Sequence, residues 1–379
     1  MTKAAELAKM GEVLTNSQIG GRRNIVINGA MQVAQRGTSS SGLGASGGYF
    51  TMDRMLLDFS GTAGRLTMSQ STDAPNGFAN SLKLDCTTAD TSIAAAETGF
   101  IQYRIEGQDL QQFKKGTSDA EKMTVSFYVK GNGNATYICE LYDGDNARQI
   151  SKTFAVTSSW NRVVLTYDGD TTGAFDDDNA LSLYIIIWIH SGSNFNSGTL
   201  STTWTAQTAA NRAVGGSSFF SSTDNELYIT GLQMEIGEQA TPFEHRSFGE
   251  ELALCHRYYQ QFSGDPEAYA GTEADAESCG AGVWYGSSQI LGMLAYKAPM
   301  RTAPSISFVE AGTTTAAGDW GSWYGYQVGK TSNDTSAVDV ITSDNARFNF
   351  DTSASGSTNG GGTYGLVRDG KQIKIDAEL

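Results

Sequence analysis

An aromatic cluster in the C-terminal part of the chain is the strongest candidate for a binding site. Residues 319–326 read DWGSWYGY and set four aromatic residues among glycines, which are poor residues for a strand core: Trp320, Trp323, Tyr324 and Tyr326. Aromatic rings on such a loop expose flat apolar faces that suit the CH-rich face of a sugar ring. We therefore interpret the four residues as candidate glycan contacts. Packing in a core or at a subunit interface would use the same residue types and is the alternative.

A run of acidic residues offers a second kind of chemistry. Asp168, Asp170 and Asp176 lie close together in the sequence, and two further aspartates follow them. Carboxylate oxygens are ligands that calcium prefers, so these three residues are candidate calcium ligands. The run lacks the alternating ligand positions and the final glutamate of an EF-hand loop. A solvated acidic loop between two strands is the alternative interpretation.

The histidines give no sign of a catalytic site. His190, His245 and His256 are the only three, and none lies in an HExxH motif or near a GxSxG serine. We expect each to be a structural or surface residue, and the protein not to be an enzyme. A glycoside hydrolase stays an alternative, because only the separation of two carboxyl groups in space identifies such a site.

A predicted strand and a predicted helix in the middle of the chain separate the two β domains that we expect. Residues 227–236 alternate apolar and polar side chains, as a half-buried strand does. Gly231 interrupts the alternation where a bulge would shift the register. Pro242 then ends the strand. These features predict the closing strand of a β-sandwich.

The period of the sequence changes after this strand. Ser247 precedes Glu250 by three residues, which is the spacing of a capping box at a helix start. Apolar residues at helical spacing follow: Leu252, Cys255, Tyr258, Tyr259 and Phe262. The pattern predicts a connector helix over 247–262.

The residues before the connector read as one β domain. A hairpin is expected over 24–36, because Asn28-Gly29 is a strong turn signal. Further short strand-like runs lie at 49–59, 65–69, 81–86, 99–106, 123–130, 135–141, 149–156, 162–167 and 181–190. We expect a jelly-roll β-sandwich over 22–246. The absence of a fixed repeat period argues against a propeller or a solenoid.

The sequence predicts a smaller β domain at the C-terminal end of the chain and a short helix at the N-terminal end. Residues 263–379 hold further strand-like runs and predict a smaller C-terminal β domain, so the fold class is all-β. Residues 1–21 begin with helix formers and carry apolar side chains at spacings of three and four: Leu7, Met10 and Leu14. A helix this short is marginal alone, so we expect it to dock through these side chains, either on symmetry mates in a small bundle or in a groove on a larger assembly. A frayed arm without a partner is the alternative.

The charge composition of the chain argues against some classes of binding partner. The chain of 379 residues carries 26 Lys plus Arg against 41 Asp plus Glu, a formal net charge of −15. Phosphate binding needs clustered Lys and Arg, so we expect neither nucleic acid nor membrane insertion. No apolar run is long enough to span a bilayer, and the start lacks a secretory signal. We therefore expect synthesis in a cytoplasm and four buried free thiols: Cys86, Cys139, Cys255 and Cys279.

Two stretches resemble a family of tailed-bacteriophage structural proteins. Residues 24–37, NIVINGAMQVAQRG, and 231–259, GLQMEIGEQATPFEHRSFGEELALCHRYY, are similar to tail-fibre or virion-fibre proteins of phages from aquatic bacteria, including cyanophages. The ending KIDAEL and the opening helix that leads into GRRN also resemble that group. The resemblance implies a carbohydrate-binding-module-like jelly roll on a virion appendage. It further implies a homotrimer whose N-terminal segment docks on the particle.

These expectations combine into one hypothesis with two alternatives. We expect a virion fibre protein without catalytic activity, whose partners are its own copies, other virion proteins and host cell-surface polysaccharide. The first alternative is a capsid decoration or architectural fibre protein that binds no receptor. The second is a glycan hydrolase. The resemblance does not distinguish a tail fibre from a capsid fibre or a decoration protein.

Overall fold

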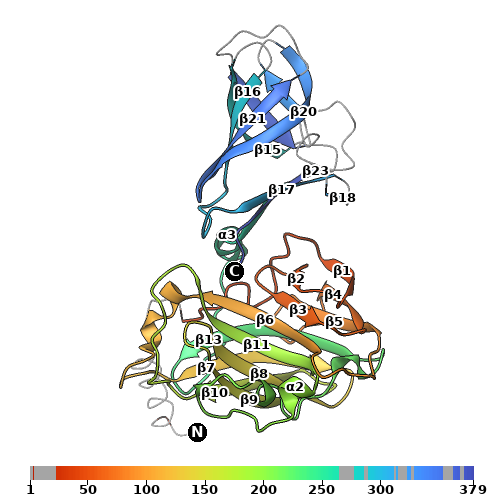
Figure 1. The fold of residues 1–379 in the computed structure, drawn as a ribbon, viewed down its shortest axis with the longest axis vertical. Coiled ribbons are helices and arrows are strands. Elements are labelled where there is room, and N and C mark those ends of the chain that lie inside the picture. Colours follow the sequence, from red (N-terminus) through yellow and green to blue (C-terminus); the bar gives the residue numbers. More distant parts are fainter. Residues whose placement is uncertain are drawn as a thin grey trace. The chain divides into compact units, whose positions relative to one another are not determined.

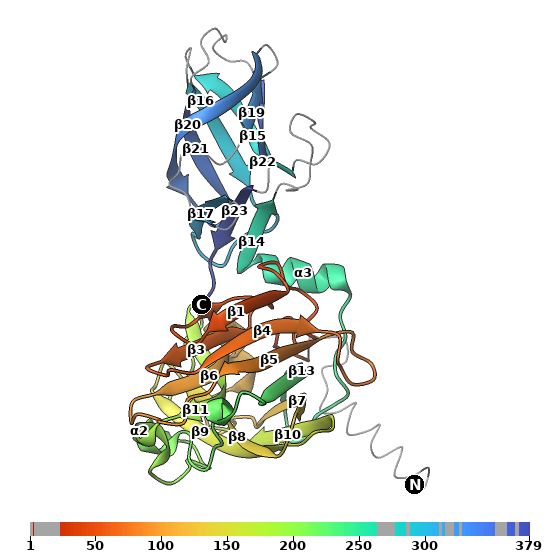
Figure 2. The ribbon, with the colours of Figure 1, turned by 90° about the vertical axis from the view of Figure 1, so that its right-hand side faces the viewer.

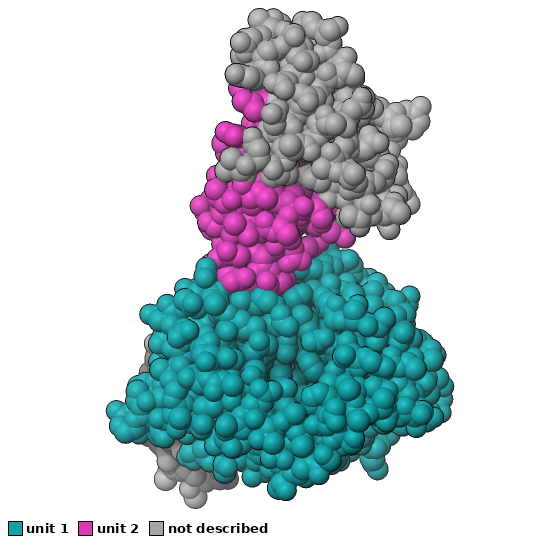
Figure 3. Space-filling view, viewed as in Figure 1, with its two compact units in different colours: residues 1–251, 379 teal, residues 252–378 magenta. Residues whose placement is uncertain are grey.

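The computed structural model describes Lys3 and residues 23–263, 277–285, 289–310, 313–314, 322–325, 328–352, 362–367 and 371–379. The chain divides into two compact units, which Figure 3 colours teal and magenta. Unit 1 contains residues 1–251 and 379, and unit 2 contains residues 252–378. The predicted docking residues Leu7, Met10 and Leu14 lie outside the described residues.

Unit 1 is a sandwich of two antiparallel sheets (Figures 1 and 2). The six-stranded sheet has the order β1 (Ser39–Leu43), β4 (Arg65–Ser71), β5 (Ser81–Thr88), β13 (Glu226–Ile236), β7 (Met123–Gly131) and β10 (Asn161–Tyr167). The seven-stranded sheet has the order β12 (Thr205–Ala206), β9 (Arg148–Val156), β8 (Ala135–Asp143), β11 (Leu181–Ser191), β6 (Thr98–Glu106), β3 (Leu56–Ser60) and β2 (Gly48–Tyr49). Short helical turns join them: η1 (Gly107–Asp109), η2 (Gln111–Phe113), α2 (Ser193–Asn196), η3 (Ala209–Asn211) and η4 (Phe219–Ser221).

The core lies between the two sheets. Alternate residues of the strands point into it, among them Leu84 and Val125 from the six-stranded sheet and Leu141 and Ile185 from the seven-stranded sheet. Burying one such side chain contributes about 1.5–3 kcal/mol. The predicted all-β jelly-roll sandwich is confirmed. Cys86, Cys139 and Cys255 are buried, and none of these three thiols forms a disulfide.

The closing strand β13 has the predicted bulge. Its pairing with β7 shifts register between Thr230 and Gln233, and Gly231 between them has a φ of +66°. A Cβ atom at this position would lie 2.8 Å from the ring of Phe78. Glycine is therefore required here both by the backbone conformation and by the close approach of the ring.

The hairpin predicted over 24–36 is wrong, because this segment forms no strand. Asn28 has a φ of +60°, and its side-chain amide donates to the carbonyl oxygens of Val33 and Asp53. The backbone N–H of Asn28 donates to Glu251 at 2.6 Å. Side chains thus form hydrogen bonds with backbone groups that would otherwise pair across a hairpin.

The connector helix α3 (Phe248–His256) starts with the predicted capping box. The backbone N–H of Ser247 donates to Glu250 at 2.9 Å, and the N–H of Glu250 lies 3.3 Å from the Ser247 hydroxyl oxygen. This reciprocal bonding satisfies two backbone donors that have no partner within the helix. None of the helices among the described residues is long and apolar enough to cross a membrane.

The helix is shorter than the predicted 247–262. It ends at His256, and Tyr259 and Phe262 lie in strand β14 (Tyr259–Ser263), which pairs with β23. Aromatic residues favour strands, and pairing with a neighbouring strand satisfies the backbone. The helical spacing of these side chains was therefore coincidental.

Unit 2 is the smaller β part. A four-stranded sheet has the order β14, β23 (Lys371–Asp376), β17 (Ser305–Glu310) and β18 (Thr313–Thr314). A closed barrel has the order β15 (Glu277–Tyr285), β16 (Gln289–Ala295), β21 (Asn345–Thr352), β20 (Val328–Ile341), β19 (Ser322–Gly325) and β22 (Gly362–Val367). Ile373 and Ile375 are fully buried. The predicted boundaries 246/247 and 262/263 flank the connector, whereas the division between the units falls inside α3.

Candidate functional site

A row of three side chains spans three neighbouring strands of the seven-stranded sheet. Tyr184 on β11 lies directly opposite Arg104 on β6 and Tyr142 on β8, and these strands run side by side in Figure 1. The residues that alternate with them along the strands, including Ile185 and Leu141, belong to the core. Because successive side chains of a strand point to opposite faces, the row emerges on the face turned away from the core. We call Arg104, Tyr184 and Tyr142 the tyrosine row.

The two tyrosine rings form a half-buried platform between two cations. Their centroids are 5.4 Å apart, and the ring planes are inclined by 52°. The guanidinium carbon of Arg104 lies 5.8 Å from the Tyr184 centroid, and that of Arg212 lies 5.0 Å from the Tyr142 centroid. The platform therefore combines apolar ring surface with hydrogen-bond donors at both ends.

A buried carboxylate holds Arg212 against this platform. Glu140 is fully buried and accepts bonds from Arg212 Nε at 2.9 Å and Nη2 at 3.0 Å. The indole N–H of Trp188 donates to the same carboxylate at 2.7 Å. Two parallel bonds fix the plane of a guanidinium group. Arg212 is therefore positioned before any ligand arrives.

Polar and aromatic side chains continue the face beside the tyrosine row. Arg104 Nε donates to Gln102 at 2.5 Å, and its Nη1 donates to the Leu379 oxygen. Phe100, half-buried, packs on Trp188, and Asp58 lies opposite Phe100 on β3. Burial raises the pKa of Asp58, and the charge of Arg104 opposes part of that effect. The face offers aromatic surface, donors and acceptors, which is the mixture that sugar hydroxyls and ring faces require.

The predicted aromatic site lies where the structure describes no side chains. Trp320 and Tyr326 lie outside the described residues. Trp323 and Tyr324 lie in β19, where the described structure gives the backbone only. Their contact with glycan stays a prediction. The tyrosine row was missed because its members are distant in sequence and meet only through strand pairing.

The three predicted calcium ligands do not form one group. Asp168 is exposed, and its carboxylate lies 3.6 Å from Lys122. Asp176 is exposed, and its backbone N–H donates to Asp145. Asp170 is buried instead and accepts two bonds from Arg148, at 2.6 and 3.0 Å. A protein cation therefore neutralises the one carboxylate of the three that is buried.

A buried lysine completes the surroundings of Asp170. The ammonium group of Lys115 lies 3.2 Å from Asp170 and 2.5 Å from Asp143, and the side chain is fully buried. It also donates to the carbonyl oxygens of Thr172 at 2.9 Å and Gly173 at 2.7 Å. We call these five residues the lysine cage. Four oxygens thus surround a cation that the chain itself supplies.

The lysine cage predicts a loss of stability in acid. Burial alone would raise the pKa of Asp170, but the bonds from Arg148 and Thr172 and the charge of Lys115 hold it below its usual 3.8. As the pH falls, the unfolded chain then takes up this proton before the folded one. The ionised Asp170 carboxylate therefore adds to the free energy of unfolding in full above about pH 4. This added stability is lost as the pH falls toward the lowered pKa of Asp170.

Urea unfolding at about pH 5 and about pH 3 measures this effect. Asp170→Asn should lose less stability over that interval than the natural protein, because it carries no titrating group at this position. Equal losses in the two proteins would contradict the assignment of the acid effect to Asp170.

The three histidines lie in different parts of the described structure. His245 packs against the rings of Phe78 and Phe243, with centroid distances of 5.1 and 4.9 Å. His256 is the last residue of α3. His190 is buried in the sandwich.

Comparisons with known proteins give no family. No family model matches the chain, and no curated protein matches it. Among solved structures, the chain is similar to the enzymatically active domain of tailspike protein 4 of bacteriophage CBA120, with 12% identity, a TM-score of 0.30, and coverage of 56% of this chain but only 21% of that chain.

Two carbohydrate-binding modules are similar at the same level. One is a family 11 module from Clostridium thermocellum, with 10% identity, a TM-score of 0.27, and coverage of 54% of this chain and 98% of the module. The other is a xylan-binding domain from Paenibacillus barcinonensis, with 12% identity, a TM-score of 0.27, and coverage of 58% of this chain and 100% of the domain. Likeness at this level assigns no function, which must rest on the chain's own geometry.

Proposed function

We propose that this protein is a non-enzymatic virion fibre protein that binds host-surface glycan through the tyrosine row. The observation that carries the glycan part is the alignment of Arg104, Tyr184 and Tyr142 on one outward face. Neighbouring strands lie about 4.8 Å apart, so the row extends over about 10 Å. That distance accommodates a short stretch of a glycan chain lying across the strands.

The chemistry of the row fits a sugar better than an apolar ligand. The inclined tyrosine rings offer apolar faces for the CH groups of a pyranose, while their hydroxyls reach its hydroxyl groups. Arg104 adds donors for ring oxygens or for carboxylates of acidic sugars. Because Glu140 already fixes Arg212, little side-chain freedom is lost there on binding.

The virion part of the proposal rests on the sequence resemblance. The two stretches that carry it are hydrogen-bonded to each other: the side chain of Glu244 accepts from the N–H of Asn24 at 3.0 Å, and Arg246 donates to the Val26 carbonyl at 3.1 Å. The resemblance thus covers residues that act together in one piece of structure. Homotrimer formation and docking through Leu7, Met10 and Leu14 belong to the same proposal. Three weak sites on one trimer would gain affinity through effective concentration.

The double variant Tyr142→Ala/Tyr184→Ala is expected to weaken glycan binding by at least about tenfold, which is about 1.4 kcal/mol. Buried or half-buried tyrosines commonly contribute that much at a binding site. The measurement is a binding isotherm of the purified protein on host cells and extracted surface polysaccharide, with the molecular mass determined on the same sample.

Two controls locate the site. Tyr128→Ala removes a half-buried tyrosine from β7 in the six-stranded sheet and should leave binding unchanged. Trp320→Ala/Trp323→Ala tests the aromatic segment of unit 2. Loss of binding in the tryptophan variant alone would move the site to that segment. A trimer that binds neither cells nor polysaccharide would favour an architectural fibre or decoration protein.

A further inference from the structure

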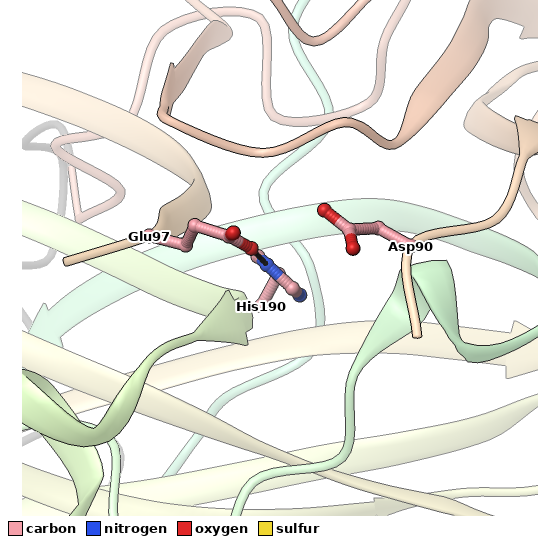
Figure 4. A group of neighbouring side chains, drawn as sticks. All are labelled: Asp90, Glu97 and His190. Atoms are coloured by element: carbon pink, nitrogen blue, oxygen red, sulfur yellow. Dashed lines mark hydrogen bonds and ion pairs between the residues drawn. The ribbon is translucent and has the colours of Figure 1, made fainter. Parts of the chain in front are cut away.

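Three buried side chains with metal-ligating atoms converge where β6 begins and β11 ends (Figure 4). Asp90 comes from the loop between β5 and β6, Glu97 directly precedes β6, and His190 lies on β11. One ligand atom of each lies within 4.8 Å of the others, and the residues are only 5%, 4% and 1% exposed. Figure 4 shows the two carboxylates and the imidazole directed toward one another.

No described lysine or arginine balances the charges of this group. Among the described residues, neither carboxylate has a lysine or arginine within 4.0 Å, and the ion-pair partner of Glu97 is His190 at 2.9 Å. A protonated imidazole would leave one net negative charge, and a neutral imidazole would leave two. Buried charge without compensation is costly. A divalent cation beside a neutral imidazole would balance the group completely.

The surroundings hold each group in the way that metal ligands are held. Ser218 Oγ lies 2.8 Å from His190 Nδ1, which leaves Nε2 directed at the carboxylates. Asp90 accepts from the Thr62 hydroxyl at 2.9 Å, and Glu97 accepts from the Ala94 N–H at 2.8 Å. Carboxylate oxygens have further lone pairs, and hydrogen bonds of this kind orient metal ligands.

Backbone groups also hold the carboxylate of Asp90. It accepts from the N–H of Ala63 at 2.7 Å and from the N–H of Ser92 at 3.2 Å. The ring of Phe220 packs edge-on against His190, with centroids 5.4 Å apart. A hydrogen-bonded carboxylate therefore faces an imidazole in buried surroundings.

We propose that Asp90, Glu97 and His190 bind one first-row divalent cation, with zinc the best fit. A neutral imidazole with carboxylates suits zinc or manganese, whereas calcium and magnesium prefer oxygen ligands alone. Ligand atoms of a tetrahedral zinc site lie about 3.3 Å apart. The gap of 2.9 Å between His190 Nε2 and Glu97 would have to open by only a few tenths of an ångström. The Nε2 proton would leave to solvent, and Nδ1–H would donate to Ser218.

The ion would join the β5–β6 loop to strand β11 and so stabilise unit 1. Full-length protein stripped with a chelator should take up one zinc ion per chain after dialysis, measured by elemental analysis following gel filtration. Its Tm should rise by about 5 °C or more. Calcium or magnesium at the same concentration should give no shift.

His190→Gln should abolish zinc uptake, and His245→Gln is the matched control that should retain it. Because His190→Gln also removes buried hydrogen bonds, cobalt binding to the unaltered protein gives a readout that needs no variant. Bound cobalt should show visible absorption typical of nitrogen and oxygen ligands, and zinc should displace it. Absence of zinc uptake and of a cobalt spectrum in the unaltered protein would overturn the proposal. Full uptake by a folded His190→Gln protein would do the same.

Discussion

Replacing Lys115 by methionine is expected to destabilise unit 1 by about 3–5 kcal/mol, the usual cost of removing one partner from a buried ion pair. Methionine retains most of the side-chain volume, so the loss is electrostatic rather than a cavity effect. The carboxylate of Asp143 is fully buried and that of Asp170 nearly so, and both would lose their contact with the ammonium group. The carbonyl oxygens of Thr172 and Gly173 would lose their shared donor as well.

Urea unfolding at neutral pH measures this loss. The matched control is Lys122→Met, which removes a lysine that is 42% exposed and 2.7 Å from Glu238. An exposed pair of this kind contributes about 0–1 kcal/mol. If Lys115→Met lost no more stability than the control, the lysine cage would not be a major source of stability. A reduced urea dependence in Lys115→Met alone would indicate partial unfolding instead.

The lysine cage also explains why the acidic run that contains Asp170 resembles a calcium site in the sequence. Four oxygens around one point form the donor set that hard cations prefer, and the sequence displays the carboxylates that supply part of it. The sequence does not display the occupant, because Lys115 lies 55 positions before Asp170. Whether a carboxylate meets a metal ion or an ammonium group is decided by tertiary packing. Local pattern alone therefore points to Asp170 as a candidate ligand but does not show that Lys115 and Arg148 are its neighbours.

Local sequence patterns correctly predicted features that depend only on residues close together in the sequence. The bulge at Gly231 and the capping box of Ser247 and Glu250 each depend on a few neighbouring residues, and both are present. The length of α3 was overestimated, because β14 gains a pairing partner more than 100 positions away. The tyrosine row also depends on pairing between strands that are distant in the sequence. Tyr142 and Tyr184 meet through the register of β8 and β11, which no short window of sequence contains.

The second large effect is expected from Asn28→Ala, which should destabilise unit 1 by about 4 kcal/mol or more. Asn28 is buried, and its side chain bonds to the carbonyls of Val33 and Asp53 at 2.8 and 2.9 Å and to the Val33 N–H at 2.9 Å. Each buried backbone group that loses its partner costs about 1–3 kcal/mol. Alanine would also have to adopt the positive φ of this position, which costs about 1–2 kcal/mol.

Asn28→Gly separates the two contributions, because glycine accepts a φ of +60° but loses the same three hydrogen bonds. It should recover about 1–2 kcal/mol relative to Asn28→Ala and remain well below the natural protein in urea unfolding. If the glycine variant matched the natural protein, the cost would lie in the backbone and not in the hydrogen bonds. Asn28 lies within the NIVINGAMQVAQRG stretch that resembles phage fibre proteins. A large loss of stability, with glycan binding retained below the unfolding temperature, would assign that resemblance to the folding of the sandwich and leave ligand recognition to the tyrosine row.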